Sequence, residues 1–166
     1  TAQDSNSPIK IVETVVEINE KRKFEMANKI VRACGGSLKE KKVAVLGLTF
    51  KPNTDDMRDA PSLVIVPALV KEGADVYVYD PQGMDEAKGM LKGVHWCNDT
   101  YEVMENADVI AILTEWNEFR ALDLARVKSL MSKPIMVDLR NIYNPDEMVE
   151  AGFDYHCVGR KISNEH

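Results

Sequence analysis

The sequence has few cysteines and histidines. Its cysteines are Cys34, Cys97 and Cys157. They lie far apart and form no CxxC pair, so neither a zinc site nor a disulfide framework is indicated. The histidines, His95, His156 and His166, also lack the spacing of metal ligands. We therefore expect no metal site and three thiols that are buried or inert.

Long hydrophobic runs and an excess of positive charge are also absent. No apolar stretch approaches the ~18 residues of a membrane-spanning helix, and the first residues lack the regions of a secretory signal. The formal net charge is -6, whereas a nucleic-acid-binding protein needs a basic surface to neutralise phosphates. We expect a cytoplasmic chain without membrane or nucleic-acid partners, in which an anionic ligand would meet a local cluster of cations.

The composition that remains is that of a globular protein, with 45% hydrophobic and 29% charged residues. The 166 residues suffice for one α/β domain and an appendage. From Pro8 to Val31 apolar residues recur at the spacing of a helix face, and Gly35 and Gly36 suit its end. Such a helix would be ~40 Å long, so part of it must pack outside this domain. We divide the chain into a helix, residues 1–35, and a domain, residues 36–166.

Beyond residue 42, short apolar runs alternate with helical patterns. The predicted strands are 43–46, 75–79, 94–96, 109–113, 135–137 and 155–158, and the predicted helices are 62–72, 85–91, 100–106, 122–131 and 145–151. Several strands are apolar on both faces, as in parallel sheets covered by helices. Pro67 should kink its helix or delay its start, because an interior proline costs ~3 kcal/mol. The fold class is α/β, a Rossmann-like doubly wound parallel sheet preceded by the long helix.

The loop after the first predicted strand is the first candidate for a binding segment. It runs from Gly47 to Ser62, whereas connections of this kind usually have ~2 to 6 residues. In open parallel sheets, ligands bind beyond the carboxyl ends of the strands. The loop has only the first glycine of the GxGxxG fingerprint, so we do not expect a dinucleotide in the usual position.

This loop combines an aromatic ring, Phe50, with two cations, Lys51 and Arg58. An aromatic face can support a nucleobase, and Lys or Arg can meet a diphosphate. The alternative is structural: Phe50 packs into the core, and the two cations pair with aspartates of the same loop. Spacing alone favours that alternative slightly.

Three residues after other strands are further candidates. Arg140 follows a predicted strand and should lie at the same sheet edge as the loop, although an ion pair with Asp138 is an equal alternative. Asp80 closes the second strand, where a Rossmann fold has its ribose-binding acid, but its distance from the loop glycine exceeds the ~20 residues of the fingerprint. A turn formed with Pro81 is the favoured interpretation. We interpret Trp116 as a packing residue.

Together these segments resemble the nucleotide-sugar 6-dehydrogenases, the UDP-glucose/GDP-mannose dehydrogenase family. The similarity extends over nearly the whole chain. The matching segments are Gly47 to Ser62, Tyr79-Asp80-Pro81, Thr114-Glu115-Trp116, Asp138-Leu139-Arg140-Asn141 and Glu17-Ile18-Asn19-Glu20.

The resemblance implies an upstream NAD-binding domain, a central helix that forms a homodimer, and a C-terminal domain that binds the nucleotide half of the substrate. This chain would be the end of the central helix followed by the C-terminal domain. By position, Phe50 and Lys51 would contact the UDP-sugar, Arg140 the uridine diphosphate, and Arg58 would reach across the interdomain cleft towards NAD.

The family oxidises the sugar C6 in two successive NAD-dependent steps, as from UDP-glucose to UDP-glucuronate, through a cysteine thiolate. That cysteine lies in a Gly-Gly-Ser-Cys context upstream of the central helix, and no cysteine here has this context. The resemblance therefore implies that the catalytic residues and most of the NAD site lie outside this chain, which alone would be inactive.

Other hypotheses remain. A related UDP-sugar dehydrogenase, for example one acting on UDP-N-acetylmannosamine, would have a similar domain. The chain could also serve mainly as an assembly module that pairs with another copy through its long helix. A stand-alone coenzyme-binding domain is disfavoured by the missing glycines.

Overall fold

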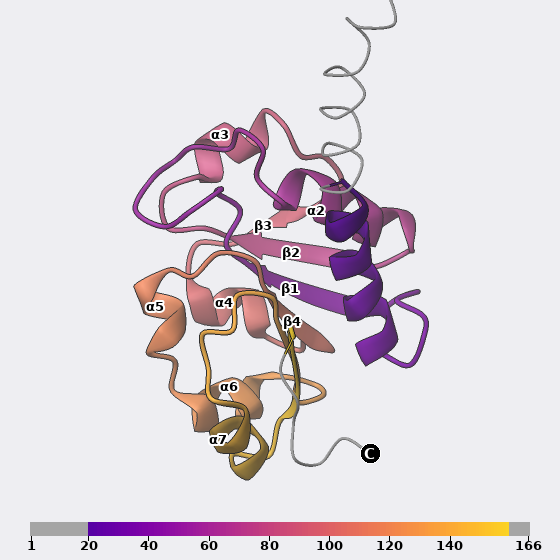
Figure 1. Ribbon diagram of the computed structural model, residues 1–166, viewed down its shortest axis with the longest axis vertical. Helices are drawn as coiled ribbons and strands as arrows, with labels where there is room; N and C mark the ends of the chain where they lie inside the picture. Colours follow the sequence, from indigo (N-terminus) through magenta and orange to yellow (C-terminus); the bar gives the residue numbers. More distant parts are fainter. Residues whose placement is uncertain (1–19, 160–166) are drawn as a thin grey trace, which may run out of the picture.

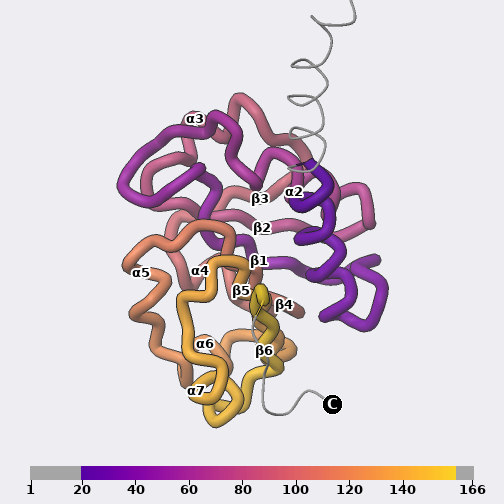
Figure 2. Tube along the Cα trace, in the orientation of Figure 1, coloured from indigo at the N-terminus to yellow at the C-terminus, as the bar shows by residue number. Residues whose placement is uncertain are grey.

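The structure, a computed structural model, describes residues 20–159. These residues contain a parallel sheet of six strands in the order β3-β2-β1-β4-β5-β6 (Figures 1 and 2). The strands are β1 (Lys42–Leu46), β2 (Asp75–Tyr79), β3 (His95–Trp96), β4 (Val109–Ile112), β5 (Ile135–Asp138) and β6 (Asp154–Cys157). The chain winds outward from β1 to β3, returns to β4 and continues to β6. The predicted doubly wound, Rossmann-like fold is therefore confirmed.

The central strands are apolar on both faces because helices cover both faces. In β1, Val43 and Val45 join one core cluster, and Ala44 and Leu46 join the other. All four residues of β4 are buried as well. The outer strand β6 instead alternates exposed or half-buried with buried residues. The burial pattern thus follows each strand's place in the sheet.

The helices form the two outer layers. They are α2 (Ser62–Lys71), α3 (Met84–Lys88), α4 (Thr100–Met104), α5 (Asn117–Arg120), α6 (Leu124–Leu130) and α7 (Pro145–Glu150), after a helix over residues 20–33. The helix over 20–33, α2 and α3 contribute to the first core cluster, and α4 to α7 contribute to the second. Figure 1 shows these two groups around the sheet. Asp99, Asp123 and Asn144 cap α4, α6 and α7 with their side chains.

The helix over residues 20–33 packs on the sheet domain through buried Ala27 and Ile30. It ends as predicted, at Gly35 and Gly36, whose φ values of 84° and 99° suit glycine. The Gly36 amide donates to the carbonyl of Val31 at 3.0 Å. The earlier part of the predicted helix, from Pro8, lies outside the described residues.

Helix α2 has nearly the predicted range, whereas α5 and the start of α6 differ from the predictions. Helix α2 begins at Ser62 although Pro67 lies inside it, so the later start is excluded. Pro67 is on the exposed side of α2, where water can reach a backbone carbonyl that has lost its helical partner. Instead of one helix from residue 122, the structure has the short α5 and then α6, which begins after its cap Asp123.

Candidate functional site

The loops after β1 and β4 meet at the carboxyl edge of the sheet. Gly47 has a φ of 93°, and a Cβ at this position would lie 2.5 Å from the Cβ of Thr114. The Thr114 hydroxyl donates to the carbonyl of Thr49 at 2.7 Å. Glycine is therefore required where the two loops touch, because any side chain would push them apart.

The buried carboxylate of Asp80 anchors the loop after β1. Its Oδ2 accepts from the amides of Leu48 at 2.7 Å and Thr49 at 3.0 Å, and from Trp116 Nε1 at 3.2 Å. Its Oδ1 accepts from the amides that follow Pro81, at 2.9 and 2.7 Å. The predicted turn is confirmed, and the packing role of Trp116 is confirmed by its 5% exposure. Sequence reasoning missed the anchoring of the loop.

The loop closes at its base and leaves Phe50 at the surface. The Ser62 hydroxyl donates to the carbonyl of Leu48 at 2.6 Å, across the loop. The Phe50 amide donates to the carbonyl of Asp56 at 2.9 Å, and the Phe50 side chain is 48% exposed. The alternative in which Phe50 packs into the core is therefore wrong.

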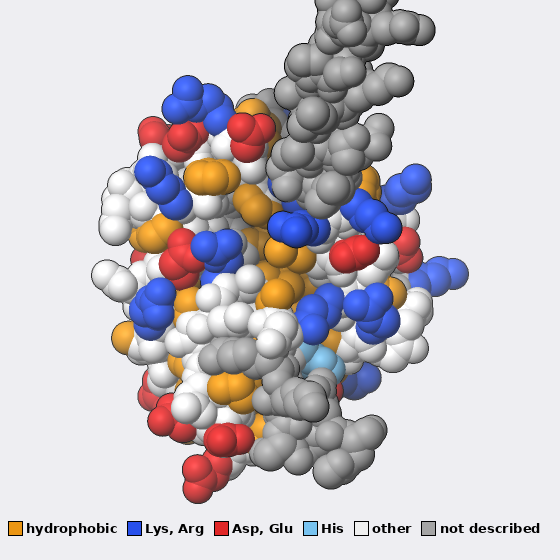
Figure 3. All heavy atoms as spheres, in the orientation of Figure 1, with side chains coloured by type: hydrophobic (Ala, Val, Ile, Leu, Met, Phe, Trp, Pro, Cys, Tyr) orange, Lys and Arg blue, Asp and Glu red, His pale blue; other side chains and the backbone are white. Residues whose placement is uncertain are grey.

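Phe50 borders a hollow of about 520 Å³, which we call the Phe50 hollow. Its lining comprises Phe50, Asp59 and Pro61 of the loop and Glu20, Arg22, Lys23 and Met26 of the helix over 20–33. The volume is within the ~300 to 1,000 Å³ of small-molecule sites. In the space-filling view, hydrophobic side chains gather in the middle of the face shown, with charged side chains of both signs around them (Figure 3). Sequence reasoning missed the contribution of the helix.

Arg140 lies next to this hollow. It borders a narrow crevice, the Arg140 crevice, with Met26, Pro61, Ile65, Leu113 and Leu139. Met26 and Pro61 belong to the linings of both spaces, so the crevice adjoins the Phe50 hollow. The structure thus brings Phe50 and Arg140 to one part of the sheet edge, from loops far apart in the sequence.

A second buried carboxylate, Asp138, shapes the loop that bears Arg140. Asp138 has no exposed surface and accepts from the amides of Arg140, Ile142 and Tyr143 at 3.1, 2.8 and 3.1 Å. The Tyr155 hydroxyl adds a hydrogen bond at 2.6 Å. The expected alternative, an ion pair between the Arg140 side chain and Asp138, is not formed, because the guanidinium pairs with Glu115.

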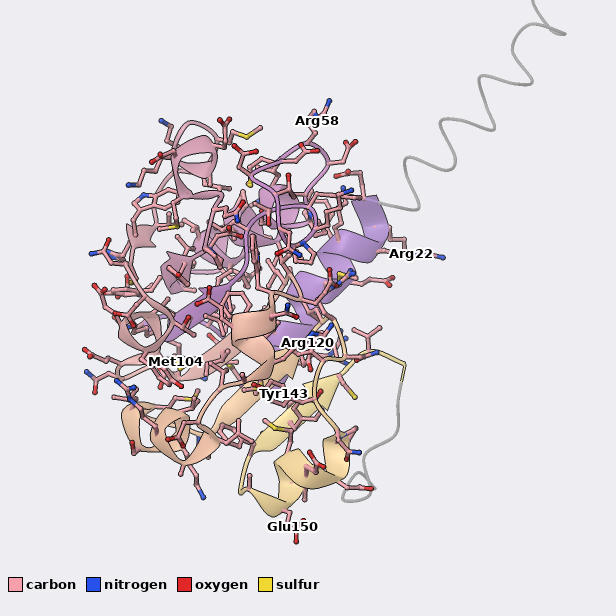
Figure 4. The ribbon with its side chains drawn as sticks, turned by 90° about the vertical axis from the view of Figure 1, so that its left-hand side faces the viewer. Arg22, Arg58, Met104, Arg120, Tyr143 and Glu150 are labelled. Carbon is pink, nitrogen blue, oxygen red and sulfur yellow. The ribbon has the colours of Figure 1, made fainter. Side chains whose placement is uncertain are left out.

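Lys51 and Arg58 are both exposed, in different settings. Lys51 follows Phe50 and lines neither the Phe50 hollow nor the Arg140 crevice. Arg58 Nε and Nη2 donate to the Asp56 carboxylate at 3.1 and 3.2 Å, so the structural alternative holds for Arg58. These hydrogen bonds, with the charges of Arg58 and Lys51, lower the pKa of Asp56. The Arg58 side chain is 87% exposed and points outward from the tip of its loop (Figure 4).

The thiols are placed as structural residues. Cys34, Cys97 and Cys157 are buried, as expected, and form no disulfide. Burial raises the pKa of Cys34 and raises that of Cys97 to about 11, which disfavours the thiolate needed for nucleophilic attack. Residues 20–159 contain no group of three potential metal-binding side chains. No helix in this range is long and apolar enough to cross a bilayer.

The doubly wound sheet, with an aromatic ring and an arginine bordering adjoining spaces at its carboxyl edge, has the arrangement of a Rossmann-like nucleotide-binding domain. Residues 44–145 match the UDP-glucose/GDP-mannose dehydrogenase family, UDP binding domain. The chain belongs to this family.

The relatives are dehydrogenases of nucleotide sugars. Over 96% of its length the chain is 52% identical to UDP-glucose 6-dehydrogenase of Rhizobium meliloti (strain 1021) and 41% identical to UDP-glucose 6-dehydrogenase TuaD of Bacillus subtilis (strain 168). It covers 37% and 34% of these proteins, about a third of their length.

Solved structures agree with the sequence relatives. A UDP-glucose dehydrogenase from Pyrobaculum islandicum matches 89% of this chain with a TM-score of 0.68 and 30% identity, over 31% of its own chain. The UDP-N-acetyl-mannosamine dehydrogenase Cap5O from S. aureus matches 95% with a TM-score of 0.72 and 25% identity, over 34% of its own chain.

Proposed function

We propose that this chain binds the nucleotide half of a UDP-sugar. Phe50 and Lys51 would contact the UDP-sugar, and Arg140 would contact the diphosphate. The observation that carries the proposal is the shared lining, by Met26 and Pro61, of the Phe50 hollow and the Arg140 crevice. An exposed aromatic face can stack on a base, and a guanidinium can donate to two phosphate oxygens at once. Membership of the family supports uridine diphosphate as the ligand.

We further propose that the domain works within a longer NAD-dependent UDP-glucose 6-dehydrogenase, which converts UDP-glucose to UDP-glucuronate. The 52% identity to the Rhizobium meliloti enzyme supports glucose as the sugar, and a UDP-N-acetylmannosamine dehydrogenase is the alternative. NAD would be held mainly by another domain of that protein. Arg58, outward-pointing and outside the Phe50 hollow, would reach towards NAD.

The chain alone would not oxidise the sugar. Its three cysteines are buried, and the raised pKa values of Cys34 and Cys97 disfavour the thiolate that the reaction needs. Buried thiols that form no disulfide, such as Cys34 and Cys97, are also typical of proteins in a reducing compartment, which supports the cytoplasm as the location.

The test of nucleotide binding is titration calorimetry of the 166-residue chain with UDP. Arg140→Ala should weaken binding by about 10-fold or more, because it removes a charge-assisted contact to the diphosphate. Phe50→Ala should weaken the binding of both UDP and uridine, because both ligands contain the base. Arg58→Ala is the matched control, an arginine outside this group, and should change UDP affinity by less than about 2-fold. A folded chain that gives no heat with millimolar UDP would contradict the proposal.

A second function, assembly, is favoured by the exposed Phe24. This side chain is 52% exposed on the helix over residues 20–33. It borders a groove with Ala27, Asn28 and Val31 of the same helix and with Ala68, Leu69, Lys71 and Glu72 of the α2 region. We propose that this face takes part in a homodimer formed through the helix, as an addition to nucleotide binding.

A further inference from the structure

Glu115 and Arg140 form an ion pair that joins the loops after β4 and β5. The Arg140 Nε donates to the Glu115 Oε2 in a short contact. The Glu115 side chain is 19% exposed and the Arg140 side chain 42%, so the carboxylate is the more sheltered partner. The pair is therefore more than a contact between two freely solvated charges.

Hydrogen bonds hold the chain in place at both residues of this pair. Glu115 lies between Thr114, which donates to the carbonyl of Thr49, and Trp116, which donates to Asp80. The amide of Arg140 donates to the buried Asp138. The chain at Glu115 and at Arg140 is thus held in place before a ligand binds, and the guanidinium of Arg140 is hydrogen-bonded to Glu115 at Nε.

The hydrogen bond at Nε leaves most of the guanidinium free. A guanidinium has five N–H donors. Among residues 20–159, the bond to Glu115 is the hydrogen bond formed by the Arg140 side chain. The two terminal nitrogens keep their four N–H groups for a ligand that reaches Arg140 from the adjoining Phe50 hollow. Two parallel N–H bonds to phosphate oxygens need a guanidinium in a defined orientation.

We propose that Glu115 is a positioning residue for the diphosphate site. It holds Arg140 by Nε so that the terminal nitrogens are oriented for phosphate, and it stays bound to Arg140 when the ligand is present. The inference rests on the proposed UDP binding. The opposite role, in which Glu115 competes with phosphate for the guanidinium, makes the opposite prediction for every variant that loosens the pair.

The experiment is titration of the 166-residue chain with UDP and, separately, with uridine. Glu115→Ala should weaken UDP binding by about 10-fold, because the Arg140 side chain then loses its hydrogen bond and must be ordered when the ligand binds. Uridine binding should be unchanged, since uridine has no phosphate. Glu115→Gln retains an oxygen that accepts from Nε and should bind UDP within about 3-fold of the parent chain. Glu115→Asp, which withdraws the carboxylate from Nε, should weaken UDP binding as the alanine variant does.

A second comparison shows whether Glu115 acts through Arg140. In an Arg140→Ala background, Glu115→Ala should have no further effect on UDP affinity, because the residue to be positioned is gone. The unfolding midpoint of each variant reports its folding, and Glu115→Asp decides the question if the alanine variant is unfolded.

Three results would overturn the inference. Tighter UDP binding by Glu115→Ala or Glu115→Asp would show that Glu115 competes with phosphate for the guanidinium. Unchanged UDP binding would show that Glu115 has no role in the site. Equal loss of UDP and uridine binding, or the same loss in the Arg140→Ala background, would show a structural role without positioning. Absence of UDP binding by the parent chain would instead contradict the proposed function itself, and this inference would fall with it.

Discussion

Two buried aspartates organise the carboxyl edge of the sheet. Asp80 bonds the start of the loop after β1, the turn after β2 and the indole of Trp116. Asp138 bonds the backbone around Arg140. From the sequence, only the turn at Asp80 could be predicted, because the partners of Asp80 in the other loops are distant in the chain. A carboxylate surrounded by N–H donors becomes recognisable only when the fold brings those donors together.

The candidate ligand residues were recognised for a different reason. Phe50, Lys51 and Arg140 follow predicted strands, and the carboxyl ends of parallel strands share one edge. Whether Phe50 is buried or exposed could not be decided from the sequence, because an aromatic residue in a loop satisfies either pattern. The part played by Met26 and Lys23 was invisible, since their helix precedes the sheet and its packing angle is not encoded in local periodicity.

Substitution of Asp80 should reduce stability strongly. Asp80→Ala leaves several buried N–H donors without an acceptor, at a cost of about 3 kcal/mol or more in the free energy of unfolding. Urea unfolding followed by circular dichroism measures this. Asp85→Asn, at an exposed position of α3, is the control and should change stability by less than about 0.5 kcal/mol. Equal stability of the two variants would show that Asp80 is not an anchor.

The buried thiol of Cys97 should make the fold sensitive to alkali. Its pKa is about 11 in the folded chain against an ordinary 9.0, because burial disfavours the thiolate. The unfolded chain then loses this proton first, so stability should decline as the pH rises from 9 towards 11, by about 1 to 2 kcal/mol. Urea unfolding at pH 7, 9 and 10.5 measures the decline. Cys97→Ala should make the curve shallower in this window, and an identical slope would contradict the assignment.

At the scale of elements, the periodicity of the sequence was sufficient for most of the fold. The strands 75–79 and 43–46 were found nearly to the residue because they are short apolar runs next to turn-forming residues. Helix α5 was missed because four residues give no helical period, and its burial depends on Phe119 packing into the second core. The start of α6 was placed early because leucine at 122 fits the periodic pattern, whereas the cap Asp123 fixes the start.

Pro67 leads to a prediction about α2. Its ring lies inside α2 on the exposed side of the helix, where it removes one helical hydrogen bond. Pro67→Ala should raise the free energy of unfolding by about 1 to 3 kcal/mol, as measured by the urea midpoint.

Pro52 provides the matched control for that change. It lies in the loop after β1, where proline limits the freedom of the unfolded chain. Pro52→Ala should therefore lower stability slightly, by about 0.4 to 1 kcal/mol. Destabilisation by Pro67→Ala would mean that the ring contributes packing to α2.

At the scale of the whole molecule, one sheet is enclosed between two helical layers that differ in their surroundings. The layer with α4 to α7 covers the second core cluster. The other layer includes the helix over residues 20–33, whose Phe24 remains half-exposed at the groove beside α2. The long helix predicted from Pro8 stays a prediction, and the exposed apolar side chain of Phe24 is the feature of residues 20–33 on which the proposed homodimer depends.

Phe24 should therefore control self-association. Phe24→Glu places a charge on the proposed contact face and should shift the chain towards monomer, with a rise in the dimer dissociation constant of about 10-fold or more. Light scattering across a concentration series measures this. Met90→Glu is the control, because Met90 is equally exposed, at 51%, and lies outside the groove. A parent chain that is monomeric at high concentration would contradict the proposed homodimer.

The hydrogen bond between the Ser62 hydroxyl and the Leu48 carbonyl limits where the loop after β1 can vary. Because the two ends of the loop are tied at one point of the sheet, the residues between them leave and re-enter the body at the same place. Within this stretch Met57 and Ala60 are buried in the first core cluster, so insertions or a proteolytic cut are best tolerated at the exposed Asn53 and Asp55. Variation of that exposed segment would alter the surface beside Phe50 and leave the sheet behind it unchanged.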